Sequence, residues 1–118
     1  MTLTTLNTQA VIDVLSERQR QIEEEGWTPQ HDDKHRRGEL VAAALAYGTR
    51  ATVWLRLQAQ GKDEGEIALM AGRASLPATW PWEPKWWKPH GLRRCLVIAA
   101  ALIIAQIEAL DRREAGGQ

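Results

Sequence analysis

The run CLVIAAALIIA, from Cys95 to Ala105, is the longest uninterrupted apolar stretch of the chain. It is well short of the roughly 20 residues that a helix needs to cross a bilayer, so it predicts a buried helix of a soluble protein. A second stretch, GELVAAALAYGTRATVWLRLQAQ, is also small and apolar on nearly every face, as in a helix surrounded by others. Two such helices expose more apolar surface than a 118-residue monomer easily covers. We therefore expect a homo-oligomer, a dimer or a tetramer.

Helical periodicity accounts for most of the remaining sequence. We expect long helices over residues 8–25, 34–60 and 92–114, and a short helix over residues 64–72. No stretch alternates apolar and polar residues with a period of two, as a half-buried strand would. The predicted fold is therefore all-α: one domain over residues 1–118, a small bundle of three long helices and one short helix, with a Trp/Pro-rich loop before the last helix.

The first helix has a recognisable start and an apolar side. Asn7 or Thr8 is expected to cap its N-terminus, because short polar side chains accept hydrogen bonds from the first free N–H groups. Val11, Leu15 and Ile22 fall on one face at helical spacing. This face is expected to pack against the core.

Charge and cysteine content narrow the possible partners and compartments. Lys+Arg 15 balances Asp+Glu 15, which favours neither a nucleic-acid polymer nor a membrane surface as partner. The first residues, MTLTTLNTQAV, lack the basic and then apolar order of a signal peptide, so we expect a cytoplasmic protein, in the bacterial host cell if it is phage-encoded. The single cysteine, Cys95, excludes an internal disulfide framework and is expected to be a buried thiol rather than a nucleophile.

Acidic residues at the predicted helix ends are the candidate metal ligands. In an antiparallel bundle the end of one helix lies beside the start of the next, so four acids from three helices are able to converge. A cluster of carboxylates is unstable without a cation, and oxygen ligands suit Mg²⁺ or Mn²⁺. The alternative is that these acids are solvated where each helix leaves the core. The candidate ligands are Glu25, Glu39, Glu108 and Asp111.

A possible general base lies at the start of the second long helix. His35 and Glu39 are four residues apart and share a helical face. One of the acids, or His35, would orient a water for attack. The sequence has no P-loop, GxGxxG or GxSxG motif that would point to another chemistry.

The segment WPWEPKWWKPHGLRR, from Trp80 to Arg94, contains four of the six tryptophans. Its prolines stiffen it, and the basic residues lead into the N-terminus of the last helix, where backbone N–H groups favour anions. One interpretation is a nucleotide pocket in which rings stack on a base and cations hold phosphates. The other is that the rings cover the end of the bundle, and we expect both in part, with at least two of the four in the core. The candidate ligand-binding residues are Trp27, Trp82, Lys85, Trp86, Lys88, Arg93 and Arg94.

Two long strings carry a resemblance to a known group. ERQRQIEEEGWTPQHDDKHRRGELVAAALAYG and WPWEPKWWKPHGLRRCLVIAAALIIAQIEALDRRE resemble small phage and prophage proteins described as dATP/dGTP diphosphohydrolase-like. These are similar to the all-α MazG-type nucleotide pyrophosphohydrolases, including the phage MazZ enzymes. The likeness covers about residues 11–114.

The resemblance implies a helical, oligomeric enzyme that holds Mg²⁺ with EExxE and ExxD motifs. Water activated by the metal would cleave a nucleoside triphosphate between its α and β phosphates. Glu108 and Asp111 match the ExxD form, whereas Glu24 and Glu25 supply an EE pair that is followed by Thr28 in place of the third acid.

We therefore expect a metal-dependent nucleoside triphosphate pyrophosphohydrolase that converts a purine dNTP to dNMP and pyrophosphate. The alternatives are a non-catalytic, phage-encoded protein that binds or sequesters a nucleotide, and a structural oligomer in which the tryptophans form an interface.

Overall fold

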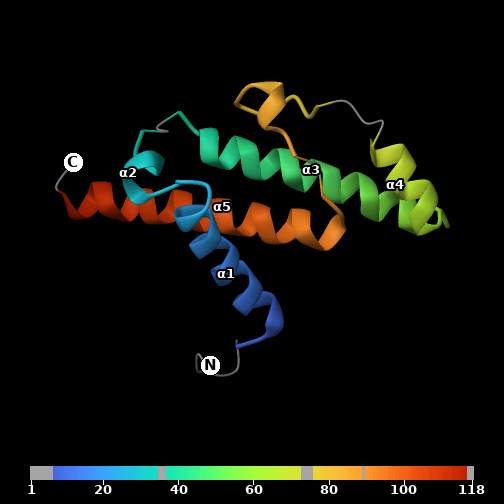
Figure 1. Cartoon of the computed structure of the whole chain (residues 1–118), viewed down its shortest axis with the longest axis horizontal. Coiled ribbons are helices and arrows are strands. Elements are labelled where there is room, and N and C mark those ends of the chain that lie inside the picture. Colours follow the sequence, from blue (N-terminus) through green and yellow to red (C-terminus); the bar gives the residue numbers. More distant parts are fainter. Residues whose placement is uncertain (1–6, 35–36, 73–75, 89, 117–118) are drawn as a thin grey trace.

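The computed structural model describes residues 7–34, 37–72, 76–88 and 90–116. Throughout these ranges the chain forms helices and loops with no strand, which confirms the all-α prediction (Figure 1). The elements in chain order are α1 (Gln9–Glu23), α2 (Pro29–Asp32), α3 (Glu39–Ala59), α4 (Glu64–Gly72), the 3₁₀ turn η2 (Pro84–Trp86) and α5 (Leu92–Ala115).

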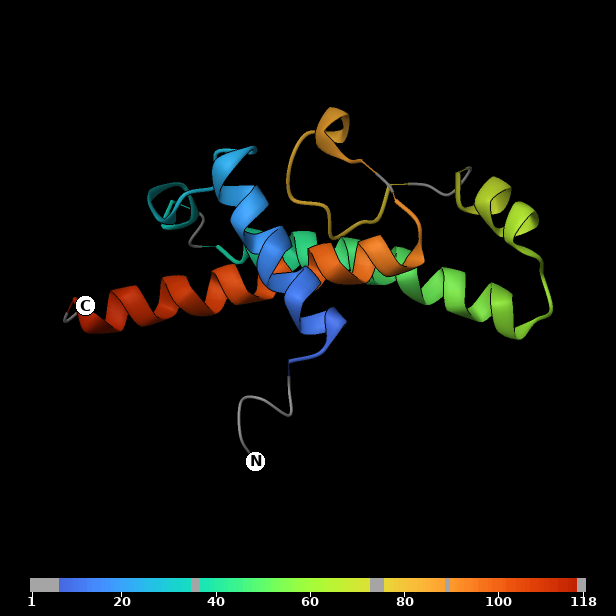
Figure 2. The same ribbon diagram turned by 60° about the horizontal axis from the view of Figure 1, so that its bottom comes forward.

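Helices α3 and α5 lie side by side and run in opposite directions along the long axis of the molecule (Figure 1). Helix α1 crosses α5, and α2 packs beside the C-terminal half of α5. Helix α4 folds back beside the end of α3 (Figure 2). The α3–α5 pair is thus the central element on which the other segments rest.

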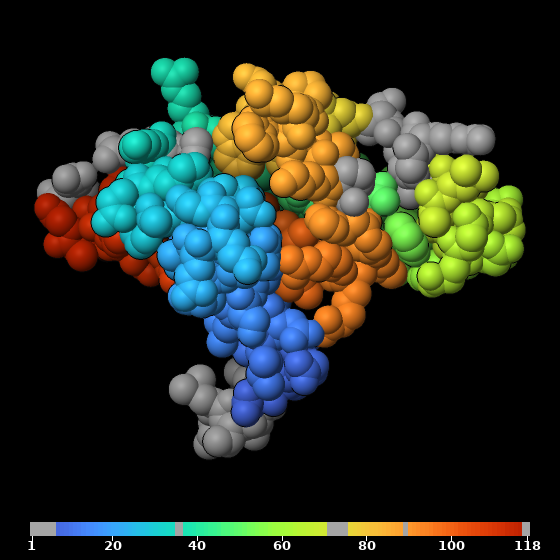
Figure 3. All heavy atoms as spheres, viewed as in Figure 1, coloured from blue at the N-terminus to red at the C-terminus, as the bar shows by residue number. Residues whose placement is uncertain are grey.

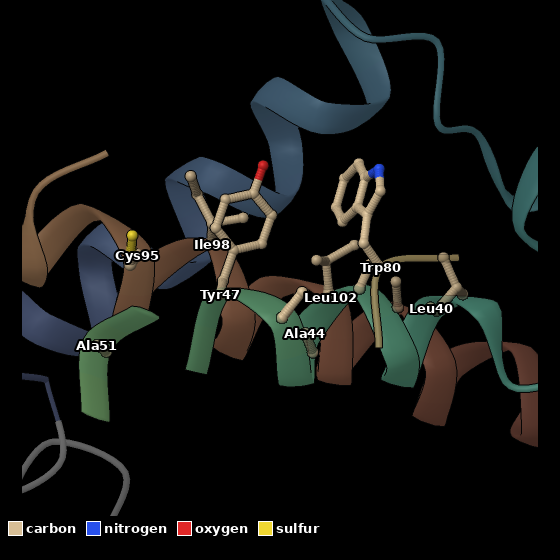
Figure 4. Close-up of a cluster of buried hydrophobic side chains, with 11 residues drawn as sticks. Leu40, Ala44, Tyr47, Ala51, Trp80, Cys95, Ile98 and Leu102 are labelled. Atoms are coloured by element: carbon tan, nitrogen blue, oxygen red, sulfur yellow. The ribbon is translucent and has the colours of Figure 1, made fainter. Parts of the chain in front are cut away.

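The main core lies between α3 and α5. Leu40 and Leu102 are fully buried there, and alanines on both helices allow the two backbones to approach closely. Cys95 is a buried free thiol, as the sequence predicts. Figure 4 shows Tyr47 and Trp80 standing on this core. A smaller cluster of Trp54, Leu57 and Ile67, with Leu92 against it, joins the end of α3 to α4.

Helix α1 packs through its polar side. Thr8 caps it by accepting a hydrogen bond from the backbone N–H of Val11 at 3.3 Å. The predicted apolar face is wrong, because Val11 and Leu15 are 40% and 56% exposed. The residues that α1 buries are Glu17, Arg18 and Gln21. The reason is electrostatic, since the surface beneath α1 presents charged groups to which these side chains bind.

The segment between α1 and α3 contains a short helix that is not among the helices predicted from the sequence. Thr28 accepts a hydrogen bond from the backbone N–H of His31 at 3.2 Å and so caps the short helix α2, which has Pro29 at its first position. The long helix α3 begins only at Glu39, after Gly38 with a φ of 83°. No helix in the described ranges is both long and apolar enough to cross a membrane.

Candidate functional site

A cavity of about 450 Å³ lies between α1, α3 and the Trp segment, by which we mean residues 80–88. On the face shown in Figure 3, the Trp segment (gold) lies beside α1 and α2 (blue to cyan). We call this space the aromatic cavity. Its lining residues are Glu17, Arg20, Glu25, Trp27, His31, Tyr47, Trp80, Trp82, Glu83, Trp86, Lys88, His90 and Ile98.

Interlocked rings form much of the wall of the aromatic cavity. Trp82 lies between Trp80, whose ring centroid is 5.3 Å away at 88°, and Trp27, at 6.1 Å and 44°. On Trp27, in turn, stacks the ring of His31, with an angle of 8° between the two ring planes. The Nε1–H of Trp80 donates to the backbone oxygen of Glu83 at 3.1 Å. Because each ring is held by another, the wall has a defined shape before any ligand arrives.

Tyr47 stands at the base of the same cavity. Its ring lies 4.8 Å from that of Trp87, and its pKa is raised to about 12, chiefly by burial and also by the nearby Cys95. The phenol is therefore neutral near pH 7 and keeps its proton for donation. His90 also lines the cavity, and burial together with the positive charge of Arg94 lowers its pKa. For both Tyr47 and His90, the shift in pKa favours the uncharged form of the side chain.

A buried carboxylate, Glu17, organises the charged side of the cavity. Its Oε1 accepts from Arg20 Nε at 2.8 Å and its Oε2 accepts from Gln21 Nε2 at 3.1 Å, while Arg94 Nη2 also donates to Oε1. Burial would raise the pKa of Glu17, but the hydrogen bonds from Arg20 and Arg94 outweigh it and lower the pKa. Glu17 is therefore ionised and links α1 to the first turn of α5.

Arg18 holds the part of the chain that carries Trp27. It is buried, and its Nη2 donates to Asp32 Oδ2 at 2.7 Å while its Nε donates to Glu108 Oε1 at 2.9 Å. Its Nη1 reaches the backbone oxygen of Trp27 at 3.3 Å. One guanidinium thus ties α1 to α2, to α5 and to the backbone that carries the Trp27 ring, because its five N–H donors diverge in one plane.

A second hollow of about 420 Å³ lies beside the first and shares Glu17 and Arg20 with it. We call it the arginine cleft. Arg93 crosses it to Asp13, with Nη1 and Oδ2 2.7 Å apart. Its lining residues are Asp13, Ser16, Glu17, Arg20, Arg93, Arg94 and Val97.

The structure gathers most of the residues that the sequence suggests for ligand binding. Four of the seven line the aromatic cavity, namely Trp27, Trp82, Trp86 and Lys88, and Arg93 and Arg94 line the arginine cleft. The remaining residue, Lys85, points to solvent, with Nζ 3.4 Å from Glu83 and 5.2 Å from the Trp86 ring centroid. Trp80 is buried, and Trp82 and Trp87 pack against the core, which confirms that at least two of the four rings are structural.

The four predicted metal ligands are not gathered in one chain. Glu25 lines the aromatic cavity but binds Arg20 Nη1 at 3.0 Å, and Glu108 is occupied by Arg18. Glu39 Oε1 accepts from the backbone N–H of Arg37 at 2.7 Å, and Asp111 is exposed. Among the described residues, no three His, Cys, Asp or Glu side chains form a group able to hold a metal ion. The predicted general base His35 lies outside these residues.

Several lining residues escaped the sequence analysis. Glu17 and Arg20 carried a signal, because their spacing of three residues puts them on one helical face. Tyr47 carried a weaker one, as the single tyrosine of the chain in a largely apolar part of its helix. His31 lies in the short helix α2 and His90 in the loop before α5, and only the folded chain shows that both line the same cavity.

Comparison with known proteins adds no further constraint. No family model matches this sequence, and neither the curated proteins nor the solved structures gave a match.

Proposed function

We propose that this protein binds a purine nucleoside triphosphate, with the base in the aromatic cavity and the phosphates in the arginine cleft. The observation that carries this proposal is the pairing of an aromatic-walled cavity of about 450 Å³ with a cleft lined by three arginines. Small-molecule sites are typically apolar hollows of about 300–1,000 Å³ with a few convergent polar groups. The resemblance seen in the sequence points to the same class of ligand.

The cavity has the chemistry of a base site. Stacking on an aromatic ring contributes about 1–3 kcal/mol per base, and a purine offers the larger face. The rings of Trp27 and Trp82 are tilted at 44° to each other, so a base is able to stack on either ring. Glu25 and Glu83 line the same space, and a carboxylate accepts hydrogen bonds without donating. They favour a base with an amino group, as adenine and guanine have.

The cleft has the chemistry of a phosphate site. Arg93 and Arg94 each hold a carboxylate, yet a guanidinium has five N–H donors and these pairs leave some of them for a ligand. Both arginines sit in the first turn of α5, where the helix N-terminus attracts anions. Arg20 lies between cavity and cleft, so it is placed to contact a sugar phosphate that passes from one to the other.

Hydrolysis of the bound triphosphate to a monophosphate and pyrophosphate is a second candidate function. It is suggested by the resemblance seen in the sequence and by Glu25 on the cavity wall, because Mg²⁺ prefers oxygen ligands. The described residues of one chain do not form a magnesium site, so we derive no catalytic step through the metal. Hydrolysis would require several acids that bind the metal together, and the predicted ligands lie apart in a single chain.

Titration calorimetry with dATP, dGTP, dCTP and dTTP, with and without Mg²⁺, tests the first proposal. Trp82→Ala should weaken purine binding by about 5- to 150-fold, the loss of one stacking contact. Lys88→Ala should also weaken it, whereas Lys85→Ala should leave it unchanged, because Lys88 lines the cavity and Lys85 does not. The proposal would be refuted if none of the four nucleotides bound.

Pyrophosphate detection in the same samples tests the second candidate. Nucleotide binding without release of pyrophosphate would refute hydrolysis and support a protein that only binds the nucleotide. Release that depends on Mg²⁺ and is lost in Glu25→Gln would establish hydrolysis.

A further inference from the structure

Tyr47 places a hydroxyl at the bottom of the aromatic cavity. It belongs to α3 and is 5% exposed, yet it is one of the residues that line the cavity. In Figure 4 its hydroxyl oxygen points away from the buried leucines and alanines of the α3–α5 core. The ring of Tyr47 is therefore part of the core, whereas its polar end belongs to the cavity.

Aromatic neighbours hold the ring of Tyr47 in place. The ring centroid of Trp87 lies 4.8 Å away, that of Trp80 lies 5.9 Å away in an edge-to-face contact at 87°, and that of His90 lies 6.5 Å away. Such contacts restrict the ring to few orientations, so the direction of the hydroxyl is set before any ligand arrives. A donor that is already oriented loses little conformational entropy when a ligand binds.

The hydroxyl of Tyr47 is a donor whose proton a ligand is able to take up as a hydrogen bond. Its pKa is raised to about 12, chiefly by burial, so the oxygen keeps its proton near pH 7. A backbone hydrogen bond with Lys88 acts in the opposite direction, as expected where the oxygen accepts rather than donates. Among the described residues, none is found to accept the proton of this hydroxyl.

Packing alone does not account for this hydroxyl. The aromatic contacts of Tyr47 are made by its ring, and a phenylalanine would make them equally well. A hydroxyl that is taken out of water without an acceptor costs free energy, and a ligand that supplies the acceptor removes that cost. The neighbouring ring of His90 favours its uncharged form, because burial and the charge of Arg94 lower its pKa. In such surroundings a hydrogen bond is stronger than in water.

We propose that Tyr47 selects purines by donating its hydroxyl proton to the ring nitrogen N7 of the base, an inference that rests on the proposed nucleotide function. N7 is an acceptor that adenine and guanine share and that cytosine and thymine lack. A pyrimidine on the same stacking wall would leave the hydroxyl without an acceptor, so it would bind less tightly. Tyr47 is thus a specificity-determining residue of the aromatic cavity.

The arrangement of the rings brings the base and the hydroxyl together. Trp80 contacts Trp82, on which the base stacks in the proposed function, and it also contacts Tyr47. The stacking surface and the donor are therefore both neighbours of one ring. A purine, with two fused rings, reaches further from Trp82 towards Tyr47 than a single-ring pyrimidine does, which adds to the selection.

Titration calorimetry with dATP and 7-deaza-dATP, in which a carbon replaces N7, tests this proposal. The wild-type protein should bind 7-deaza-dATP about 5- to 150-fold less tightly than dATP, because the hydroxyl loses its acceptor. Tyr47→Phe should bind dATP less tightly by a similar factor. This variant should bind the two nucleotides equally, because neither partner of the hydrogen bond is then left alone.

Two controls separate recognition of the base from a structural role. The affinity of Tyr47→Phe for dCTP should equal that of the wild type, so the preference for a purine falls by the same factor. Thr49→Val removes another hydroxyl of α3, which donates to Leu45 O at 2.8 Å and does not line the cavity. It should leave all affinities unchanged.

The comparison of dATP with 7-deaza-dATP on the wild-type protein needs no variant, so a folding defect in Tyr47→Phe does not obscure it. Equal affinity of the wild type for these two nucleotides would overturn the proposal, as would a loss in Tyr47→Phe that is the same for both. In each of these cases dATP still binds the wild type, so the proposed function stands. Failure of the wild type to bind any nucleotide would refute the proposed function and this inference together.

Discussion

Arg18 and Asp32 are both buried and form an ion pair in which Nη2 and Oδ2 are 2.7 Å apart. The same guanidinium binds Glu108 on α5, so a single positive charge joins three helices. This arrangement explains why α1 turns its polar side inward. Apolar residues of α1 stay outside because the ion pairs, rather than area burial, set its orientation.

Arg18→Met is expected to destabilise the fold by about 3–5 kcal/mol, because it leaves the carboxylate of Asp32 buried without its partner. A small domain has about 5–15 kcal/mol of stability, so the loss is a large part of the total. Urea unfolding followed by circular dichroism measures it. The double variant Arg18→Met/Asp32→Leu should lose less than the two single variants together. Additive losses would show that the pair is not coupled.

Glu17→Gln is expected to lower stability by about 1–3 kcal/mol, because two arginines lose a charged acceptor in a buried site. Glu23→Gln on the same helix is the control, since Glu23 is exposed and should change stability by no more than about 0.5 kcal/mol. The urea midpoints of the two variants give the comparison. Equal midpoints would contradict a role for Glu17 in joining α1 to α5.

The sequence was sufficient to predict the long helices of this fold. Strong periodicity identified α1 and α5 within a few residues of their observed ends, and Thr8 was a correct cap candidate. The orientation of α1 was not predictable in the same way. Its apolar residues follow the usual pattern, and only the position of Asp32 and Glu108 in space shows that the charged face has partners.

The candidate site was predictable where residues of one kind cluster in the chain. The composition of the Trp segment identified it as a candidate site, together with Lys88 in the segment and Arg94 shortly after it. Metal ligation depends on acids from three separate parts of the chain, and a sequence shows only that their convergence is permitted. Glu108 illustrates the limit, because its partner Arg18 lies 90 positions away in the chain.

Trp54 and Trp80 are expected to respond differently to replacement by phenylalanine. In the described part of the chain, the buried Nε1–H of Trp54 has no acceptor, so Trp54→Phe removes an unsatisfied donor along with some packing. Trp80→Phe breaks the bond to Glu83 O and opens a gap beside Tyr47. We expect a loss below about 1 kcal/mol for the first and about 1–3 kcal/mol for the second. Thermal unfolding of both variants checks the order.

Stability is expected to fall as the pH drops from about 7.5 to 5, because the pKa of His90 is lowered by burial and by Arg94. A group whose pKa is lower in the folded state binds fewer protons there. Its contribution is fully present above the unfolded pKa of about 6.5 and is lost as the pH falls through the folded value. Urea midpoints across this range should decline in the wild type and decline less in His90→Asn.

A further decline is expected at more acidic pH, where Glu17 titrates below its ordinary pKa of 4.5. The sign is the same, since the lowered pKa of Glu17 means that its stabilising ion pairs are complete above about 4.5 and are lost on protonation. Glu17→Gln should remove this decline in stability at acidic pH, while the decline caused by His90 should remain. Stability that rises on acidification from neutral pH would contradict both assignments.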